Sequence, residues 1–265
     1  MFTHNLNPVL VDFGFIAIRW YSLAYVAGIL IGWWLGKKII VERFNNFHKE
    51  DKFNLKEFDD LITYLIIAII IGGRIGYIIF YNLGYYIHNP LDTIKIWEGG
   101  MSFHGALVGI VIGTYLFSFK RGLSSLMLLD VIACVAPIGI FFGRIANFMN
   151  SELVGKVTNV SWSVTFPAFD MLPRHPSQLY EAFLEGIILF LILNIFTFKK
   201  NYKTGTCSYL FLIIYSFFRI ISEFFREPDA QIGYLFNFLS MGTILSFLMM
   251  LIGIILFAFV KKNEI

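Results

Sequence analysis

The stretch PIGIFFGRIANFMNSELVG, residues 137–155, decides the fold, because an otherwise apolar segment carries Arg144 and Asn147 three residues apart. At that spacing both side chains lie on one face of a helix. An arginine at the centre of a membrane helix costs about 2.5–3.5 kcal/mol on insertion scales. Such an arginine needs a buried partner, a water-filled cavity, a bound anion, or a path along which it can snorkel to the interface. The stretch therefore predicts a membrane helix with one of these features.

The composition agrees, since the 265 residues are 57% hydrophobic and only 15% charged. These values lie outside the range of soluble domains and predict an all-α polytopic membrane protein. We expect residues 1–265 to form one transmembrane domain. Apolar runs long enough to cross a bilayer, which takes about 20 helical residues, predict about seven helices. The runs lie near 15–36, 60–82, 102–119, 126–149, 178–198, 207–226 and 236–260.

Basic residues predict the orientation of these helices. They cluster in every second loop and in the C-terminal tail. The members are Lys37, Lys38, Arg43, Lys49, Lys52 and Lys56, then Lys120 and Arg121, then Lys199, Lys200 and Lys203, and finally Lys261 and Lys262. By the positive-inside rule the N-terminus lies outside and the C-terminus inside. The opposite loops would then form an interfacial arm at about 83–101 and a small extracytoplasmic cap at about 150–177.

Glycines at four-residue spacing predict close packing between helices. They are Gly28, Gly32 and Gly36 in the first run, Gly72 and Gly76 in the second, and Gly105, Gly109 and Gly113 in the third. The two cysteines, Cys134 and Cys207, lie inside apolar runs. We interpret both as small buried hydrophobic residues.

Polar residues within the helices share one layer. They are Tyr21, Arg74, His104, Arg144, Asn147, Glu181, Tyr215, Arg219 and Glu223. They come from helices of alternating direction, yet all map to the outer half of the bilayer. Several arginines in one layer cost on the order of 10 kcal/mol, which a hydrated cavity that binds an anion would relieve. We therefore predict one site, open to the outer leaflet, for a negatively charged head group. Arginine suits this role because its planar guanidinium binds phosphate in a bidentate manner.

Simpler interpretations stay open for the same residues. Arg219 and Glu223 are four residues apart on one helix and would satisfy each other. Glu181 and Glu185 would pair with a membrane arginine without any catalytic role. His104, at a helix start, is either a structural group or a neutral base.

Several motifs together resemble the bacterial prolipoprotein diacylglyceryl transferases along nearly the whole chain. The motifs are RWY at 19–21, GGRIGY at 72–77, WEGGMSFHGALVG at 97–109, GRIANFMNSELVGK at 143–156, RHPSQLYEA at 174–182 and YSFFRIISEFFREPDAQ at 215–231. The clearest departure is Ala106, at a position that glycine often occupies in the family. This exchange of one small residue for another should matter little.

The resemblance implies an enzyme of the bacterial inner membrane whose site faces the outer leaflet. It would move the diacylglyceryl group of phosphatidylglycerol to the lipobox cysteine of a preprolipoprotein, forming a thioether and releasing glycerol phosphate. Membrane lipid and the lipobox segment are the expected partners. We expect no cofactor, no metal and no nucleic acid, and a monomer.

The resemblance also implies roles for individual residues. Arg144 would bind the lipid phosphate, and Arg219 would be a second anion ligand. The further site residues are His104, Asn147, Glu152, Gly155, Tyr21 and Tyr215, to which we add Glu223 from the polar face of its helix. Independently of the family, guanidinium groups would stabilise the charge that grows on a leaving phosphate. A neutral histidine, with a reference pKa near 6.5, would accept the proton of a thiol whose reference pKa is about 8.5.

Other functions are weighed against this one. An anion-binding transporter or channel is the alternative, although the helix pattern shows neither an internal repeat nor a pair of helices unwound at the midplane. Metal-dependent phosphatidyl transferases place aspartates on neighbouring helical turns, and here the aspartates are scattered. An intramembrane metalloprotease is disfavoured because the sequence has no H-E-x-x-H motif.

Overall fold

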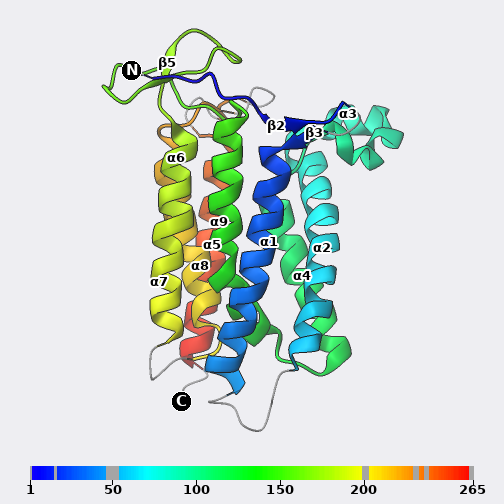
Figure 1. Cartoon of the computed structure of the whole chain (residues 1–265). Coiled ribbons are helices and arrows are strands. Elements are labelled where there is room, and N and C mark those ends of the chain that lie inside the picture. Colours follow the sequence, from blue (N-terminus) through cyan, green and yellow to red (C-terminus); the bar gives the residue numbers. More distant parts are fainter. Residues whose placement is uncertain are drawn as a thin grey trace.

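The chain forms a bundle of long helices in the computed structural model, which describes residues 2–14, 17–45, 54–198, 203–228, 233–235 and 239–262 (Figure 1). Within these ranges, seven helices are long and apolar enough to cross a membrane, as predicted. The two termini lie at opposite ends of the bundle. The basic residues Lys49, Lys52, Lys199 and Lys200, and the motif residues 229–231, lie outside the described residues.

The long helices are α1 (Trp20–Ile39), α2 (Leu55–Tyr81), α4 (Phe103–Arg121), α5 (Ser125–Met149), α6 (Ser177–Glu181) continued by η4 (Ala182–Ile188) and α7 (Leu189–Thr197), α8 (Thr206–Glu223) and α9 (Met241–Lys262). The shorter elements are β1 (Phe2–Thr3), β2 (Val9–Asp12), β3 (Ala17–Arg19), η1 (Ile40–Asn45), α3 (Leu83–His88), η2 (Pro90–Ile94), η3 (Ile96–Glu98), β4 (Val164–Thr165) and β5 (Pro173–Arg174).

Three predicted helix starts need correction, and one of them is α2, which begins at Leu55 rather than near residue 60. The first helix begins at Trp20 rather than near residue 15, because Ala17–Arg19 pairs as a strand with Val9–Asp12. The last helix begins at Met241, and residues 236–238 of the predicted run lie outside the described residues. Apolar character alone does not distinguish a helix from a short strand that leads into it.

Glycines bring α2 and α4 into direct backbone contact, as their spacing predicted. A Cβ atom built on Gly72 would lie 2.5 Å from the carbonyl oxygen of Gly105, and one on Gly76 would lie 2.5 Å from the Cα atom of Gly105. A Cβ atom on Gly109 would overlap the carbonyl oxygen of Ala68. In the absence of a hydrophobic driving force in lipid, such close approach is what holds membrane helices together.

Replacing Gly109 with alanine is therefore expected to lower the free energy of unfolding by about 1–3 kcal/mol, because the added methyl group overpacks the α2 interface. The matched control is Gly139→Ala in α5, where an added Cβ atom meets nothing within 4 Å. The control should be neutral or stabilise the protein by up to about 1 kcal/mol. Denaturant unfolding in detergent, followed by circular dichroism, measures both variants. Equal losses would contradict a tight contact between α2 and α4.

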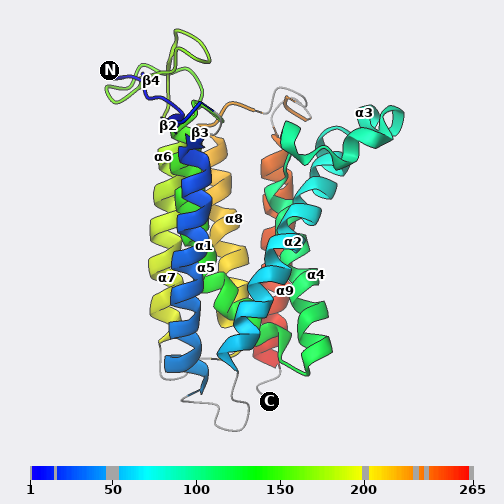
Figure 2. The same ribbon diagram turned by 45° about the vertical axis from the view of Figure 1, so that its right-hand side comes forward.

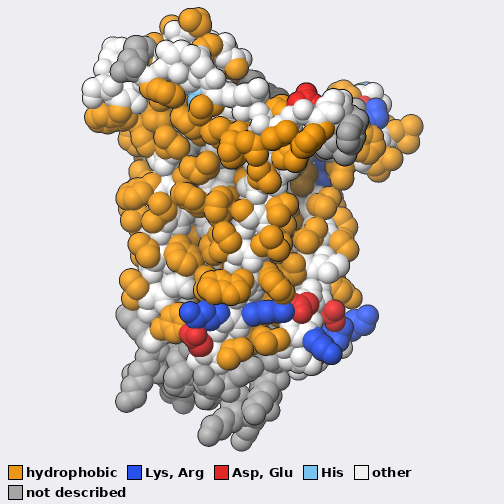
Figure 3. Space-filling view, viewed as in Figure 1, with side chains coloured by type: hydrophobic (Ala, Val, Ile, Leu, Met, Phe, Trp, Pro, Cys, Tyr) orange, Lys and Arg blue, Asp and Glu red, His pale blue; other side chains and the backbone are white. Residues whose placement is uncertain are grey.

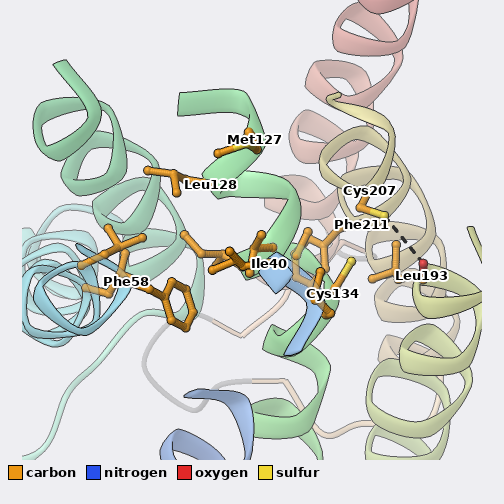
Figure 4. Packing of buried hydrophobic residues seen from close by; sticks show 14 of the residues in the cluster. Ile40, Phe58, Met127, Leu128, Cys134, Leu193, Cys207 and Phe211 are labelled. Atoms are coloured by element: carbon orange, nitrogen blue, oxygen red, sulfur yellow. Dashed lines mark hydrogen bonds between the residues drawn. The ribbon is translucent and has the colours of Figure 1, made fainter. Parts of the chain in front are cut away.

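The apolar core fills the end of the bundle opposite the cap (Figure 4). Buried members such as Ile40, Phe58, Leu128 and Leu193 lie where α1 ends, α2 and α5 begin and α7 ends. Both cysteines are buried in this cluster, as predicted, and neither forms a disulfide. This end also buries the Asp130 carboxylate, which accepts hydrogen bonds from the Gly205 N–H at 2.5 Å and the Ser208 hydroxyl at 2.6 Å.

On the face drawn in Figure 3, the surface of the bundle is a broad apolar band. Charged side chains gather at the end opposite the cap, where ion pairs join Lys37 to Asp59 and Arg121 to Asp60, each at 2.7 Å. This distribution is typical of a protein that spans a bilayer and keeps its surface charges beyond the hydrocarbon.

The cap and the arm lie at the same end of the bundle (Figure 2). In the cap, β1 pairs parallel with β4, and β4 pairs antiparallel with β5. The arm, which comprises α3, η2 and η3, extends sideways and exposes apolar side chains such as Leu91 and Trp97.

Arg74 of α2 holds the arm in place rather than joining the other arginines. Its guanidinium donates hydrogen bonds to five carbonyl oxygens of the arm and of the turn that follows it. The acceptors are Asp92, Thr93, Lys95, Gly99 and Gly100, at 2.6–3.3 Å. The expectation that Arg74 shares one anion site with the other arginines is therefore wrong, because backbone oxygens already occupy its donors.

Candidate functional site

Three helices converge on a polar cluster at the cap end of the bundle. Arg144 lies near the end of α5. Glu181 lies in α6, at the start of the helix that η4 and α7 continue. The end of α8 supplies Arg219 and Glu223. Glu185 lies in the π-helical segment η4, a helical form that is frequent at functional sites.

Arginine and glutamate side chains of this cluster form a continuous network of ion pairs. Arg144 Nε lies 2.7 Å from Glu181 Oε2, and Arg144 Nη2 lies 3.3 Å from Glu185 Oε2. Arg219 Nη1 lies 3.0 Å from Glu181 Oε1 and 3.6 Å from Glu185 Oε1. Arg219 Nη2 lies 2.5 Å from Glu223 Oε1. The structure thus contains the ion pairs that the sequence left open as an alternative.

Arg226, directly after α8, completes the network with a contact of 3.4 Å to Glu181 Oε1. Glu181 therefore contacts three guanidinium groups. Three arginines then face three glutamates, so the formal charges of the network balance. The carboxylates of Glu181 and Glu185 are almost fully buried, whereas Arg144 keeps 12% of its side chain exposed. Burial makes each of these charges dependent on its partners.

The turn after α5 joins Asn147 to Glu152. Asn147 Nδ2 donates to Glu152 Oε2 at 3.1 Å, and Asn150 Nδ2 donates to Glu152 Oε1 at 3.2 Å. Gln178 Nε2 donates to the backbone oxygen of Glu152 at 2.6 Å. Ser151 and Leu153 adopt left-handed backbone conformations, with φ of 56° and 54°. Such conformations are rare for residues other than glycine and occur where neighbouring contacts enforce them.

Gly155 connects this turn to the rest of the cap. Its N–H donates to the carbonyl oxygen of His175 at 3.1 Å, and it forms an isolated bridge with Arg226. A Cβ atom at this position would overlap the His175 carbonyl oxygen. The predicted site residue Gly155 therefore has a clear packing role beside the network.

His104 lies in the first turn of α4, close to the network. The ring is within the range of electrostatic interaction with Arg219, Glu223 and Arg144. Its Nε2 atom is buried and has no hydrogen-bond partner among the described residues. An unpartnered buried nitrogen facing a polar cluster fits a group that accepts a proton from a substrate.

The two predicted tyrosines are placed differently. Tyr215 is fully buried, and its ring stacks on Phe103 at 4.7 Å and on Phe211 at 5.5 Å. Tyr21 is half-buried in α1, 3.4 Å from the hydroxyl of Tyr25. Tyr215 therefore packs beneath the network, whereas Tyr21 lies at its edge on another helix.

The cap has its own charge cluster. Arg174 binds Asp170 through Nε and Nη2, and binds Glu227 Oε2 at 3.0 Å and the Gly155 carbonyl oxygen at 2.9 Å through Nη1. The Arg174 guanidinium lowers the pKa of Asp170 below its usual range, and burial lowers the pKa of His175. These contacts fix β5 against the turn that carries Gly155.

Sequence reasoning missed some members of the site. Arg226 was not among the predicted site residues, and Glu185 was predicted only as a partner of a membrane arginine. Ser240, whose Oγ donates to Glu223 Oε2 at 2.7 Å, gave no signal because its place depends on how the chain returns from α8 to α9. The i, i+4 spacing of Glu181 and Glu185 in an apolar helix indicated that they pair with a membrane arginine, but it did not indicate which arginine.

These features define a class: a multi-pass α-helical membrane protein with a buried, charge-balanced arginine–glutamate network beneath a small cap. A family model described as prolipoprotein diacylglyceryl transferase matches residues 8–259. A Rickettsia bellii protein named phosphatidylglycerol–prolipoprotein diacylglyceryl transferase is 54% identical over 254 residues, covering 95% of this chain and 94% of the relative. The Rickettsia typhi protein of the same name is 51% identical over 255 residues, covering 96% of each chain. The chain belongs to the prolipoprotein diacylglyceryl transferase family.

Proposed function

We propose that this protein transfers the diacylglyceryl group of phosphatidylglycerol to the lipobox cysteine of preprolipoproteins. The observation that carries the proposal is the family match over residues 8–259, with relatives of that name at 51–54% identity across nearly the whole chain. In the reaction the thiol sulfur attacks the glyceryl carbon that carries the phosphate, and the carbon–oxygen bond breaks. The products are a thioether and glycerol phosphate, and the thiol proton passes to a base.

Arg144 is our candidate for the phosphate ligand, with Arg219 as the second. Arg144 and Arg219 keep 12% and 8% of their side chains exposed. In the structure Glu181 and Glu185 occupy both guanidinium groups. A lipid phosphate would replace part of these contacts, and the guanidinium groups would then stabilise the charge on the leaving group.

The remaining site residues line the same end of the bundle. Asn147, Glu152 and Gly155 form the turn above Arg144, and Glu223 and Tyr215 flank Arg219 on α8. Tyr21, at the edge, would face a lipid arriving between helices. We propose that these residues position the two substrates and that the protein acts as a monomer.

The proposal includes the place of the site in the cell. The inner membrane of a bacterium holds phosphatidylglycerol and the lipobox segments of preprolipoproteins. With the N-terminus outside and the C-terminus inside, the cap, the arm and the ion-pair network would face the outer leaflet. The single domain would thus consist of the helix bundle with these two outer elements.

The test uses purified protein in detergent with phosphatidylglycerol and a peptide that carries a lipobox cysteine. Mass spectrometry follows the lipidated peptide, and an enzymatic assay follows glycerol phosphate. Equimolar formation of both, absent with a Cys→Ser peptide, supports the proposal. A folded protein that binds lipid but yields no product would contradict it, and a tracer-anion flux assay in liposomes would then test the transporter alternative.

His104→Gln is expected to lower kcat by about 10²–10⁴-fold, because glutamine keeps a polar group at Nε2 but accepts no proton. The matched control is His88→Asn in the exposed arm, where the imidazole contacts the Gly84 carbonyl oxygen. The assay above, run between pH 6 and 9, measures both variants. An unchanged rate and an unchanged pH profile in His104→Gln would exclude the role of base.

A further inference from the structure

His4 is a buried histidine that the proposed chemistry does not use. It follows β1, and its backbone N–H donates to the Thr165 carbonyl oxygen at 2.9 Å, which ties the N-terminal segment to β4. The residue is only 4% exposed. Its ring lies between Phe148 of α5 and Phe166 of the cap, at 4.9 and 5.3 Å. A buried imidazole in an aromatic pocket is held in one position.

The imidazole contacts the turn that presents Glu152. His4 Nδ1 lies 3.1 Å from Ser151 Oγ, so the two atoms share a hydrogen bond. Ser151 has the left-handed backbone conformation that this turn requires. The next residue, Glu152, accepts hydrogen bonds from Asn147 and Asn150. A rare backbone conformation persists where side-chain contacts enforce it, and here His4 supplies such a contact.

We propose that His4 is a positioning residue for the transferase site: through Ser151 it holds the turn that presents the Glu152 carboxylate to Asn147. The inference rests on the proposed function, in which Asn147 and Glu152 position substrate. The match to the family model begins at residue 8, so His4 lies outside the part of the chain that the model describes.

Protonation of His4 would disturb this arrangement. Its Nε2 atom is buried without a hydrogen-bond partner among the described residues. In the tautomer whose Nδ1–H donates to Ser151 Oγ, the neutral ring has no proton on Nε2, so protonation would bury an unsatisfied N–H there. Burial lowers the pKa of His4 below 6.5. The charged groups on the surrounding elements have partners of their own: Glu152 with Asn147 and Asn150, Arg174 of β5 with Asp170, and Arg144 of α5 with Glu181.

The sign of the pH effect follows from these observations. The folded protein keeps His4 neutral, whereas the unfolded chain takes up a proton near pH 6.5. The stability that His4 contributes is therefore fully present above about pH 6.5 and is lost as the pH falls toward the lower pKa of the folded state. Between the two pKa values, the equilibrium constant for the intact turn should fall by up to about tenfold per pH unit, and it should level off below the lower pKa.

Two variants of His4 distinguish the effect of its hydrogen bond to Ser151 from the effect of its protonation. In His4→Asn the amide replaces Nδ1 and can still bond to Ser151, but it does not titrate in this range. In His4→Phe the ring remains and the hydrogen bond is lost. We expect His4→Asn to keep kcat/KM at pH 8 within about threefold and His4→Phe to lower it by about 10- to 100-fold, as for a misplaced site residue. His88→Asn is again the control, because it removes an exposed histidine of the arm.

The decisive readout is the ratio of wild-type kcat/KM to that of His4→Asn at each pH, because the titration of the thiol and of His104 cancels in it. The ratio should be constant above about pH 7 and fall in acid. A ratio that stays flat down to pH 5 would overturn the inference. Ser151→Ala should lower kcat/KM in the wild type but not further in His4→Phe, and independent, multiplying losses would also overturn it.

A second measurement separates this inference from the proposed function. If the wild type forms no thioether at any pH, the proposed function fails. The unfolding midpoints of wild type and His4→Asn between pH 5 and 8 then test the link between His4 and the turn. A wild-type midpoint that falls more steeply in acid supports the link, and parallel curves overturn it.

Discussion

Glu181→Leu is expected to lower the free energy of unfolding by about 3–5 kcal/mol, the usual loss when one member of a buried ion pair is removed. The carboxylate is almost fully buried and contacts Arg144, Arg219 and Arg226 at 2.7, 3.0 and 3.4 Å. Leucine fills a similar volume but leaves three guanidinium groups together, with Glu185 and Glu223 as the remaining acidic partners. Repulsion among buried like charges then adds to the lost attraction.

Glu227→Gln is the matched control for this experiment. Glu227 also pairs with an arginine, Arg174, at 3.0 Å, but 42% of its side chain is exposed. Exposed pairs contribute about 0–1 kcal/mol, so the control should change little. Denaturant unfolding in detergent gives both free energies. Comparable losses in the two variants would show that the network does not depend on Glu181.

Replacing Arg144 is expected to cause a large loss of activity. Arg144→Ala should lower kcat/KM by about 10²–10³-fold, the effect of removing one preorganised donor from a site where negative charge develops. Arg144→Lys should recover little of this loss, because an ammonium group cannot reproduce the planar fork that contacts Glu181 through Nε and Glu185 through Nη2.

The control for Arg144 is Arg121→Lys, at the opposite end of the bundle. Arg121 pairs with Asp60 at 2.7 Å, and both side chains are exposed. This variant should keep wild-type kcat/KM. Binding of phosphatidylglycerol to each folded variant, measured by calorimetry in detergent, separates a phosphate ligand from a purely structural arginine. Unaltered lipid affinity and kcat/KM in Arg144→Ala would exclude the phosphate role.

The helices were predictable because the bilayer imposes both length and apolar character on each of them. The glycine contacts between α2 and α4 were predictable for a similar reason, since four-residue spacing places small residues on one face. The start of α1 was not, because Ala17–Arg19 forms a strand through its pairing with Val9–Asp12. Pairing between segments is a property of the folded chain and leaves little trace in local composition.

The sequence predicted that the polar residues of the site lie in one layer of the bundle. It did not predict which of these residues contact one another. Arg144, Arg219 and Glu223 were expected in one half of the bundle, and the structure joins them through Glu181. Arg74 has the same residue type and the same depth in its helix, yet it binds backbone oxygens of the arm. Which acceptor an arginine meets depends on the path of distant loops. His4 was overlooked because its neighbours, Ser151 and Phe166, are about 150 residues away in sequence.

The attachment of the arm by Arg74 bears on how the arm can evolve. All five hydrogen bonds that Arg74 donates end on main-chain oxygens, which every amino acid carries. The anchor therefore recognises mainly the path of the backbone, and in addition the guanidinium lies over the Tyr86 ring of α3, 5.2 Å from its centroid. Mutations can accumulate on the exposed surface of the arm, at positions such as Leu91 and Trp97, without releasing it from the bundle. A single arginine thus leaves most side chains of this outer element free to vary.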